Sequence, residues 1–378
     1  MFELTEEQHS IVAMVAEFAA ENIAPHAVTW DQEHHFPVDV LAQAGELGMG
    51  GIYVREDFGG SGMTRLDAAL IFEELAKADP TISAYISIHN MVAWMVDRFG
   101  NDAQRAAWLP QLCTMETLAS YCLTEPGVGS DAAALSTRAV REGDEYVLNG
   151  TKQFISGAGA SGLYVVLART ADTGSAGISA FLVPDGTPGL SFGALEKKMG
   201  WNAQPTRQVV FEDLRIPVSN LLGEEGAGFS IAMKGLNGGR VNIGACSLGG
   251  GQAALDKSIT YLKERSAFGA PLIGQQALMF QIAQMQTELE SARTMVWRAA
   301  DALEHGSKDT VRLCAMAKLV ATDAGFSAAN TALQLHGGYG YLAEYGIEKI
   351  VRDLRVHQIL EGSNEIMKLI IGRIAIDS

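Results

Sequence analysis

Several features are scarce in this sequence, and each scarcity excludes a class of protein. Cysteine occurs only four times in 378 residues, and no two cysteines have C-x-x-C spacing. Neither a disulfide framework nor a zinc site is therefore predicted, which fits a reducing compartment and a protein without a bound metal. No uninterrupted apolar run approaches the roughly 18 residues of a membrane span, and the N-terminus has no signal-peptide or Arg-rich leader pattern. We therefore expect a cytoplasmic protein with no membrane partner.

Basic side chains are also scarce relative to acidic ones. The 28 Lys and Arg residues against 44 Asp and Glu give a net charge of −16. Such a charge repels phosphate backbones, so no nucleic-acid partner is predicted. An anionic small molecule can still bind through local arginines and helix N-termini, and a docking protein with a basic face is favoured. The length and the 48% of hydrophobic residues predict a globular chain of two or three domains.

The first part of the chain, residues 1–118, has the apolar period of an α-helical domain. Thr5 and Gln8 have the spacing of a capping box at the start of a first helix. Gly100 is expected to end a later helix as a left-handed glycine. The other predicted helices cover residues 38–47, 66–77 and 81–99.

The middle part, residues 119–226, changes to the period of 2 that is typical of strands. Asn149-Gly150 predicts a type I′ hairpin between two of these strands. We expect a small antiparallel sheet or barrel. The predicted strands cover residues 120–124, 135–141, 145–148, 151–155, 163–168, 178–183 and 208–211.

The last part, residues 227–378, returns to the helical period. A long helix is expected to run to about Arg265, and an apolar stripe over residues 278–303 then ends at Gly306. A stripe of small residues over 314–335 indicates closely packed antiparallel helices. The predicted fold is mainly α with a β domain: an N-terminal helical domain (1–118), a middle antiparallel β-barrel-like domain (119–226) and a C-terminal four-helix bundle (227–378).

The segment RVHQILEGSNEIMKLIIGR contains a candidate base, Glu361. Glu361 lies beside Gly362 in a turn, and Ser363 can cap the helix that follows. A carboxylate at the entrance of a packed helix, with a glycine beside it for close approach, is what a proton-abstracting base requires. From position alone, a solvated glutamate in a turn is the commoner interpretation. The apolar stripe expected for this helix is Ile366, Leu369, Ile370 and Ile374.

Two glycine-rich segments have different implications. Residues 157–162, GAGASG, satisfy the dinucleotide-binding pattern, but a strand follows them where that motif requires a helix, so a nicotinamide site is rejected. Residues 121–131, YCLTEPGVGSD, place a Gly-rich turn after a strand. Its backbone N–H groups can bind a pyrophosphate, although an ordinary Pro-Gly turn remains the alternative.

Two more glycine pairs are ambiguous by themselves. Gly337 and Gly338 end a helix, where they can serve as a simple C-cap or allow a planar ring to lie against the backbone. Gly238 and Gly239 precede Arg240, and each glycine weakens a helix by roughly 1 kcal/mol relative to alanine. Such a loss of stability indicates that another group approaches the helix closely at these glycines. A neighbouring helix is the default candidate for that group.

Four segments occurring in order identify a family resemblance: YCLTEPGVGSD, RSAFGAPLIGQ, QLHGGYGY and ILEGSNEIM. Together they resemble the acyl-CoA dehydrogenase family over essentially the whole chain, and four motifs in sequence are highly specific where each alone is not. KGLNGGR and VRDLRVHQILEGSNEIM look most like the branch that oxidises isobutyryl-CoA in valine breakdown. The family fold has the same helical, β, helical order.

This resemblance implies one non-covalent FAD per subunit, a homotetramer, and electron-transfer flavoprotein as electron acceptor. Phe154 stands where many relatives carry Trp. Arg265 and residues 334–338 match positions that typically reach the FAD of the neighbouring subunit. The implied cofactor residues are Tyr121, Leu123, Thr124, Gly129, Ser130, Phe154, Ile155, Ser156, Arg265, Phe268, Gln276, Gln334, Leu335, His336, Gly337, Gly338, Ser363, Asn364 and Glu365.

The resemblance also implies the chemistry. Glu361 matches the catalytic base, which removes the α-proton of the thioester while the β-hydrogen leaves as hydride to flavin N5. Some relatives place the base just before the helix arginine, where this chain has Gly239, which cannot serve. The alternatives are a 2-methylbutyryl- or straight-chain acyl-CoA dehydrogenase, an acyl-CoA oxidase, or a non-catalytic flavin or acyl-CoA binding protein. The implied acyl-CoA contacts are Ser130, Asn237, Gly238, Gly239, Arg240 and Arg373.

Overall fold

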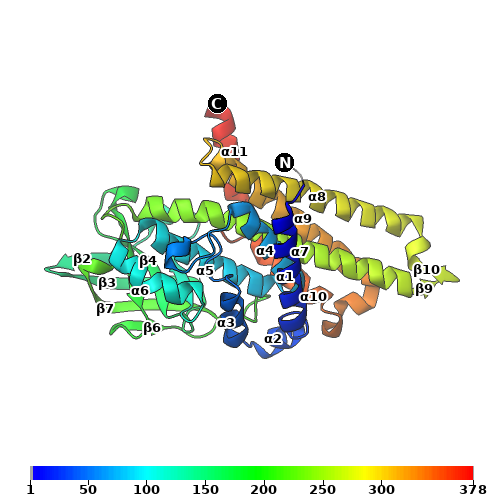
Figure 1. Cartoon of the computed structure of the whole chain (residues 1–378), viewed down its shortest axis with the longest axis horizontal. Helices are drawn as coiled ribbons and strands as arrows, with labels where there is room; N and C mark the ends of the chain where they lie inside the picture. The colour runs from blue at the N-terminus through cyan, green and yellow to red at the C-terminus, as the bar shows by residue number, and fades with distance from the viewer. Residues whose placement is uncertain (1–2, 378) are drawn as a thin grey trace.

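A computed structural model describes residues 3–377 and begins with six α-helices (Figure 1). The predicted capping box of Thr5 and Gln8 is present at the start of α1, and a second box of Thr64 with Asp67 begins α4. Both boxes pair backbone N–H groups that a helix N-terminus otherwise leaves free. These helices are α1 (Glu6–Asn22), α2 (Ala27–Glu33), α3 (Val38–Glu46), α4 (Arg65–Ala78), α5 (Pro80–Phe99) and α6 (Asp102–Cys113).

Gly100 ends α5, but the prediction of a left-handed glycine is wrong. Its φ of −67° and ψ of 153° are extended values that any residue adopts. An added Cβ would lie 2.4 Å from the carbonyl oxygen of Val96, so glycine is required here by contact with the preceding turn. The chain leaves α5 extended because Asn101 at once caps α6 through its bond from the N–H of Gln104.

The middle of the chain forms an eight-stranded sheet with the order β6-β7-β3-β2-β4-β5-β8, and β1 also pairs with β4. The sheet is mixed, which corrects the prediction of an antiparallel one. β4 runs parallel to both β1 and β2, because the chain between β1 and β4 is long enough to return in the same direction. The strands are β1 (Ala119–Cys122), β2 (Arg138–Glu142), β3 (Glu145–Ser156), β4 (Leu163–Arg169), β5 (Ile178–Pro184), β6 (Leu190–Phe192), β7 (Thr206–Pro217) and β8 (Leu221–Leu222).

The predicted hairpin at Asn149-Gly150 is also wrong, because both residues lie inside the continuous strand β3. The pairing of β3 with β7 shifts register there, as at a β-bulge. The Asn149 amide exchanges two hydrogen bonds with Asp213 of β7, and Gly150 has a φ of +149°. An added Cβ on Gly150 would lie 2.6 Å from the Thr137 hydroxyl, so the glycine serves close packing. The actual turn is Gly143-Asp144, which joins β2 to β3.

Five helices and a small hairpin follow the sheet. Figure 1 shows the first of them, α7, running from the sheet at one end of the molecule to the β9–β10 hairpin at the other. Its 37 residues span roughly 55 Å. The elements are α7 (Gly228–Glu264), β9 (Ser266–Ala267), β10 (Ala270–Pro271), α8 (Gln276–Glu304), α9 (Thr310–His336), α10 (Ile347–His357) and α11 (Asn364–Asp377). The predicted order of helical, β and helical parts is therefore confirmed.

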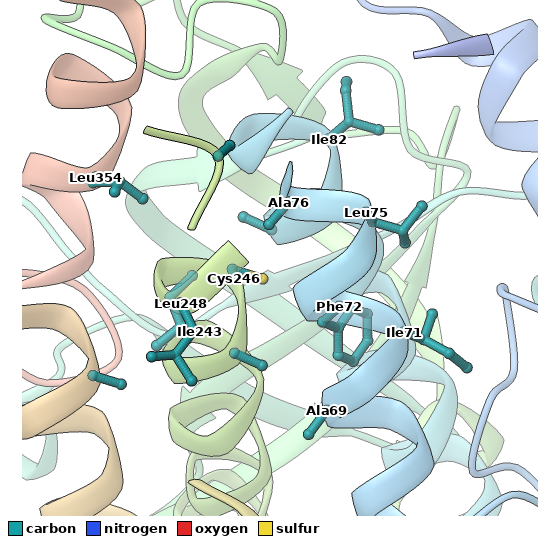
Figure 2. Packing of buried hydrophobic residues seen from close by; sticks show 14 of the residues in the cluster. Ala69, Ile71, Phe72, Leu75, Ala76, Ile82, Ile243, Cys246, Leu248 and Leu354 are labelled. Carbon is teal, nitrogen blue, oxygen red and sulfur yellow. The ribbon is translucent and has the colours of Figure 1, made fainter. Parts of the chain in front are cut away.

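The N-terminal and C-terminal helices share one hydrophobic core. Figure 2 shows Phe72 and Ala76 of α4 facing Cys246 of α7, with Leu354 of α10 on the other side of α7. α4 and α7 approach each other closely at Gly249, where an added Cβ would lie 2.1 Å from the Glu73 carbonyl oxygen. This packing holds α7, and the glycines within it, in a fixed position.

The last helix, α11, packs less deeply than its apolar stripe predicted. Met367 is fully buried, whereas Leu369 is 45% exposed and Ile376 is 85% exposed. Among residues 3–377, no single helix is long and apolar enough to cross a membrane; only α1 and α2 together, bent by 53° between them, meet that test by length and composition.

Candidate active site

Glu361 lies in the connection between α10 and α11 with an unusual backbone conformation. Its φ is +57°, and Gly362 follows with a φ of +91°. The turn directs the carboxylate toward Gly239 of α7, where an added Cβ would lie 2.4 Å from Oε2 and 2.7 Å from Cδ. A side chain at position 239 would therefore displace the carboxylate. Glu361 and position 239, the two positions that the resemblance offers for a base, are therefore adjacent, and glycine at 239 leaves space for the glutamate side chain.

Glu361 is half-buried, but its Oε2 is inaccessible to water, and this burial raises the pKa of the carboxyl group to about 7 because the charged form loses hydration. The positive charges of Arg240 and then Lys318 oppose the rise. Arg240 is 6% exposed; its Nε donates to the Glu361 carbonyl oxygen at 3.2 Å, and its Nη1 donates to Asn237 Oδ1 at 2.9 Å. Oε2 of Glu361 has no hydrogen-bond partner among the described residues. A carboxylate with this pKa and a free oxygen can accept a proton at neutral pH.

Tyrosine side chains stand near this carboxylate. Burial and then the charge of Glu361 raise the pKa of Tyr121 well above its usual value, and its hydroxyl is buried without a partner in the described chain. Tyr53 accepts a hydrogen bond from Asn242 at 3.1 Å and lies 3.7 Å under the Arg65 guanidinium. Burial also raises the pKa of Tyr53, so both hydroxyls remain protonated at neutral pH. They make the site polar without adding a second base.

Residues 363–365 begin α11 and differ in their surroundings. Asn364 is 5% exposed, and its Oδ1 accepts a bond from Lys318 while its Nδ2 donates to Thr322 and Asp323. Its amide is thus used inside the protein. Ser363 is half-buried and Glu365 is exposed.

The predicted flavin-facing segments lie side by side. The N–H of Gln153 donates to the carbonyl oxygen of Thr124 at 2.8 Å, which brings Phe154 next to the end of β1. Phe154 has a φ of +59° and is 65% exposed, so its ring faces outward from the sheet. An added Cβ on Gly127 or Gly129 would meet nothing within 4 Å. An exposed ring beside an open, Gly-rich turn fits a planar aromatic ring that carries phosphates.

This Gly-rich turn is anchored by a buried ion pair. Lys152 Nζ donates to Glu125 Oε1 at 2.8 Å and to the Leu123 carbonyl oxygen at 3.1 Å, and both charged side chains are at most 3% exposed. Burial raises the pKa of Glu125, but the attraction of Lys152 and hydrogen bonds from Ser136 and Thr137 outweigh it and lower the pKa to about 2. The residues at the start of the turn are therefore held in place.

Substituting Lys152 with methionine should destabilise the protein. The Glu125 charge would be left buried without its cation, which costs about 3–5 kcal/mol, and urea unfolding measures the loss.

The stability of the wild-type protein should also depend on pH through Glu125. The folded pKa of Glu125 lies below its unfolded value, so its stabilisation exists above about pH 4.5 and disappears as pH falls toward 2. Arg138→Met, which breaks an exposed pair with Asp172, is the control and should change stability by less than about 1 kcal/mol. Equal losses in both variants would contradict the anchoring role.

A second group of predicted cofactor residues gathers at the far end of α7. We call it the distal cluster: Arg265, Phe268, Gln276 and residues 334–338. Tyr261 of α7 stacks on His336 at 4.4 Å, and the Arg265 guanidinium lies 5.6 Å from the Tyr339 ring, which joins the ends of α7 and α9. Phe268 is 95% exposed with a φ of +53°, whereas Leu335 and His336 are buried. Figure 1 places this end of α7, beside β9 and β10, opposite the sheet.

The sequence pattern missed three residues of the site: Tyr53, Arg65 and Lys318. Lys318 is the one for which the sequence carried a signal. It follows Cys314 by four residues and so falls within the buried stripe of small residues in α9, where a lysine is out of place. Arg65 reaches the site through the packing of α4 on α7, and Tyr53, in the loop before α4, accepts a hydrogen bond from Asn242 of α7. No group of His, Cys, Asp or Glu suited to hold a metal occurs within residues 3–377.

The chain is similar to known proteins in both sequence and structure. Three family models match: acyl-CoA dehydrogenase N-terminal domain over residues 5–116, middle domain over 120–214 and C-terminal domain over 226–376. The chain is 55% identical to the mitochondrial isobutyryl-CoA dehydrogenase of Bos taurus over 98% of this chain and 89% of that protein. It is 54% identical to the Dictyostelium discoideum protein of the same name, with the same coverage. The structure of butyryl-CoA dehydrogenase from Megasphaera elsdenii matches with a TM-score of 0.96 at 37% identity over all of both chains. Because the first two relatives are named mitochondrial, the cytoplasmic location stays a prediction.

Proposed function

Because the chain belongs to the acyl-CoA dehydrogenase family, and is therefore an oxidoreductase, we propose that it dehydrogenates isobutyryl-CoA to methacrylyl-CoA. The choice of a short, α-branched acyl group follows the two relatives at 55% and 54% identity. One observation of this chain carries the proposal: a carboxylate with a pKa of about 7 is seated against Gly239 with one oxygen free.

In the proposed mechanism, Glu361 accepts the α-proton of the thioester. A pKa near the working pH suits a general base, because the group is deprotonated and still basic enough to take the proton. Its own backbone N–H would donate to the thioester oxygen and stabilise the developing enolate charge. Ser130, Asn237, Gly238, Gly239, Arg240 and Arg373 would contact the acyl-CoA. Arg240 also donates to the Glu361 carbonyl oxygen at 3.2 Å.

The proposal includes one FAD per subunit. Tyr121, Leu123, Thr124, Gly129 and Ser130 would hold it along the turn after β1, and residues 154–156 would lie along its ring. The fit rests on the exposed Phe154 ring beside a turn in which Gly127 and Gly129 have open space. Bound FAD would supply the acceptor for the β-hydride. Residues 363–365 would close the site from the α11 side.

A homotetramer is part of the same proposal. From Arg240 to Arg265, α7 runs for 25 residues, or roughly 37 Å. Figure 1 places this end of α7 opposite the sheet to which β1 belongs, so the distal cluster would reach a cofactor that a neighbouring subunit holds. The exposed Phe268 and the exposed apolar side chains Leu369 and Ile376 of α11 are consistent with covered surfaces in an assembly. The electron acceptor would be electron-transfer flavoprotein, and a net charge of −16 suits a partner with a basic face.

Anaerobic flavin bleaching and steady-state turnover with a dye acceptor, measured on the purified holoenzyme with a panel of acyl-CoA substrates, test the substrate. Isobutyryl-CoA should have a kcat/KM at least about tenfold above that of butyryl-CoA or 2-methylbutyryl-CoA, because moving or adding one methyl group changes kcat/KM by roughly 10–200-fold in an apolar pocket. A preference for butyryl-CoA would contradict the branched substrate. Measured in air, dye reduction should greatly exceed peroxide formation, and the reverse would indicate an oxidase.

A further inference from the structure

The turn that carries Glu361 is conformationally strained. A non-glycine residue with a left-handed φ, here +57°, is uncommon and persists only where its surroundings hold it. Gly362 continues the same unusual backbone with a φ of +91°. Two side chains donate hydrogen bonds to the backbone carbonyl oxygens of this turn. Arg240 binds that of Glu361 at 3.2 Å, and Lys318 binds that of Gly362 at 2.9 Å.

Lys318 is an unusual partner for a backbone carbonyl. The residue is fully buried in α9, and its Nζ donates to the Gly362 carbonyl oxygen and, at 2.8 Å, to Asn364 Oδ1. No carboxylate of the described chain lies within ion-pair distance, so the ammonium faces only neutral acceptors. Burial lowers the pKa of Lys318 to about 8. Burying a cation without a carboxylate partner is unfavourable, so we expect Lys318 to have a role in the contact that its ammonium makes with the turn.

The groups around Glu361 come from four parts of the fold. Arg240 faces it from α7, Lys318 from α9, Tyr121 from β1 and Tyr53 from the loop before α4. Lys318 itself is also influenced by Asp323 and Glu365. Among these, Arg240 and Lys318 are the cations whose charge favours the deprotonated carboxylate. Arg240 adjoins Gly239 in the chain, whereas Lys318 is fully buried and contacts the carbonyl oxygen of Gly362, the residue after the base.

We propose that Lys318 is a positioning residue for the base: its ammonium holds the Gly362 carbonyl oxygen and so fixes the left-handed turn that aims the Glu361 carboxylate along Gly239. The inference rests on the proposed function of Glu361. The same positive charge stabilises the deprotonated carboxylate, which keeps the base active near neutral pH.

Lys318→Met removes the ammonium and keeps an unbranched side chain of similar length. In the FAD-loaded variant, kcat with isobutyryl-CoA should fall about tenfold or more, because a misplaced base loses catalysis steeply. KM should stay within about threefold, because Lys318 does not touch the substrate. The acidic limb of the kcat/KM profile should move about one pH unit upward, since the base loses a neighbouring cation.

Lys318→Gln separates the hydrogen bond from the charge. Its amide can still donate to Gly362, so it should recover part of the lost kcat while the acidic limb stays displaced upward. Thr322→Val, one turn along α9, is the matched control, because it removes a hydroxyl that accepts a bond from Asn364 at 3.0 Å and leaves the Lys318 contact to Gly362. The control should keep the wild-type pH profile.

Flavin content and thermal unfolding decide whether the effect is local. A folded Met or Gln variant with wild-type kcat and an unmoved acidic limb would overturn the inference, and so would the loss of folding in both variants, because Lys318 would then be a structural residue. Glu361→Gln separates this failure from that of the proposed function. If the Glu361 variant loses flavin bleaching and the Lys318 variants do not change, only the role of Lys318 is wrong.

Discussion

Replacing Glu361 with glutamine should abolish flavin bleaching by isobutyryl-CoA on the catalytic timescale. The amide has nearly the same shape but cannot accept the α-proton, and loss of a general base lowers kcat by roughly 10²–10⁴-fold. The charged groups that act on the Glu361 carboxylate are the cations Arg240 and Lys318, and the nearby Tyr121 and Tyr53 have raised pKa values, so none of these groups replaces the base. Stopped-flow absorbance of the bound flavin under anaerobic conditions measures the rate directly.

The pH profile gives an independent check of the same residue. For the wild-type protein, kcat/KM should decrease as pH falls through about 7, because Glu361 becomes protonated below its pKa. The residual activity of Glu361→Gln should lack this limb. Glu17→Gln, on the exposed face of α1, is the control and should behave as wild type. A glutamine variant that holds FAD and acyl-CoA and still bleaches the flavin normally would rule out Glu361 as the base.

A single methyl group at position 239 should impair catalysis nearly as strongly. In Gly239→Ala, the new Cβ would lie 2.4 Å from Glu361 Oε2 and 2.7 Å from Cδ, so the carboxylate must move. A displacement on the order of 1 Å at the reacting group lowers kcat by about 100-fold. FAD content should remain normal, because the proposed FAD contacts do not include Gly239 and the new Cβ meets only the Glu361 side chain among its nearest atoms. Steady-state kinetics with isobutyryl-CoA and a dye acceptor measure the effect.

Gly372→Ala is the matched control for this substitution. Gly372 also lies inside a helix, α11, but an added Cβ there meets nothing within 4 Å. It should leave kcat unchanged and stabilise the protein by up to roughly 1 kcal/mol through higher helix propensity. If Gly239→Ala retained the wild-type kcat, the carboxylate would not occupy this place during catalysis.

Local patterns in the sequence determined the order of the fold. Apolar periodicity predicted helices before and after the strands. The pair Thr5 and Gln8 predicted the start of α1, and Gly306 predicted the end of α8, because caps and left-handed glycines depend on neighbouring residues. The dipeptide Asn149-Gly150 wrongly predicted a hairpin turn, because it has the residue types of a turn but lies inside β3. Its pairing with Asp213 and the close approach of Thr137 come from distant strands, and these contacts make it a bulge.

The site divides in the same way. The sequence by itself determined that Glu361 stands in a turn before the last helix, and its motifs pointed to the family. Only the tertiary structure decided that this carboxylate meets Gly239, 122 residues earlier (361 − 239), and that Arg240 and Lys318 fasten its turn from two other helices. The pKa of about 7 follows from that burial and those two charges. Burial and charge are properties of the packed helices together, and no local pattern encodes them.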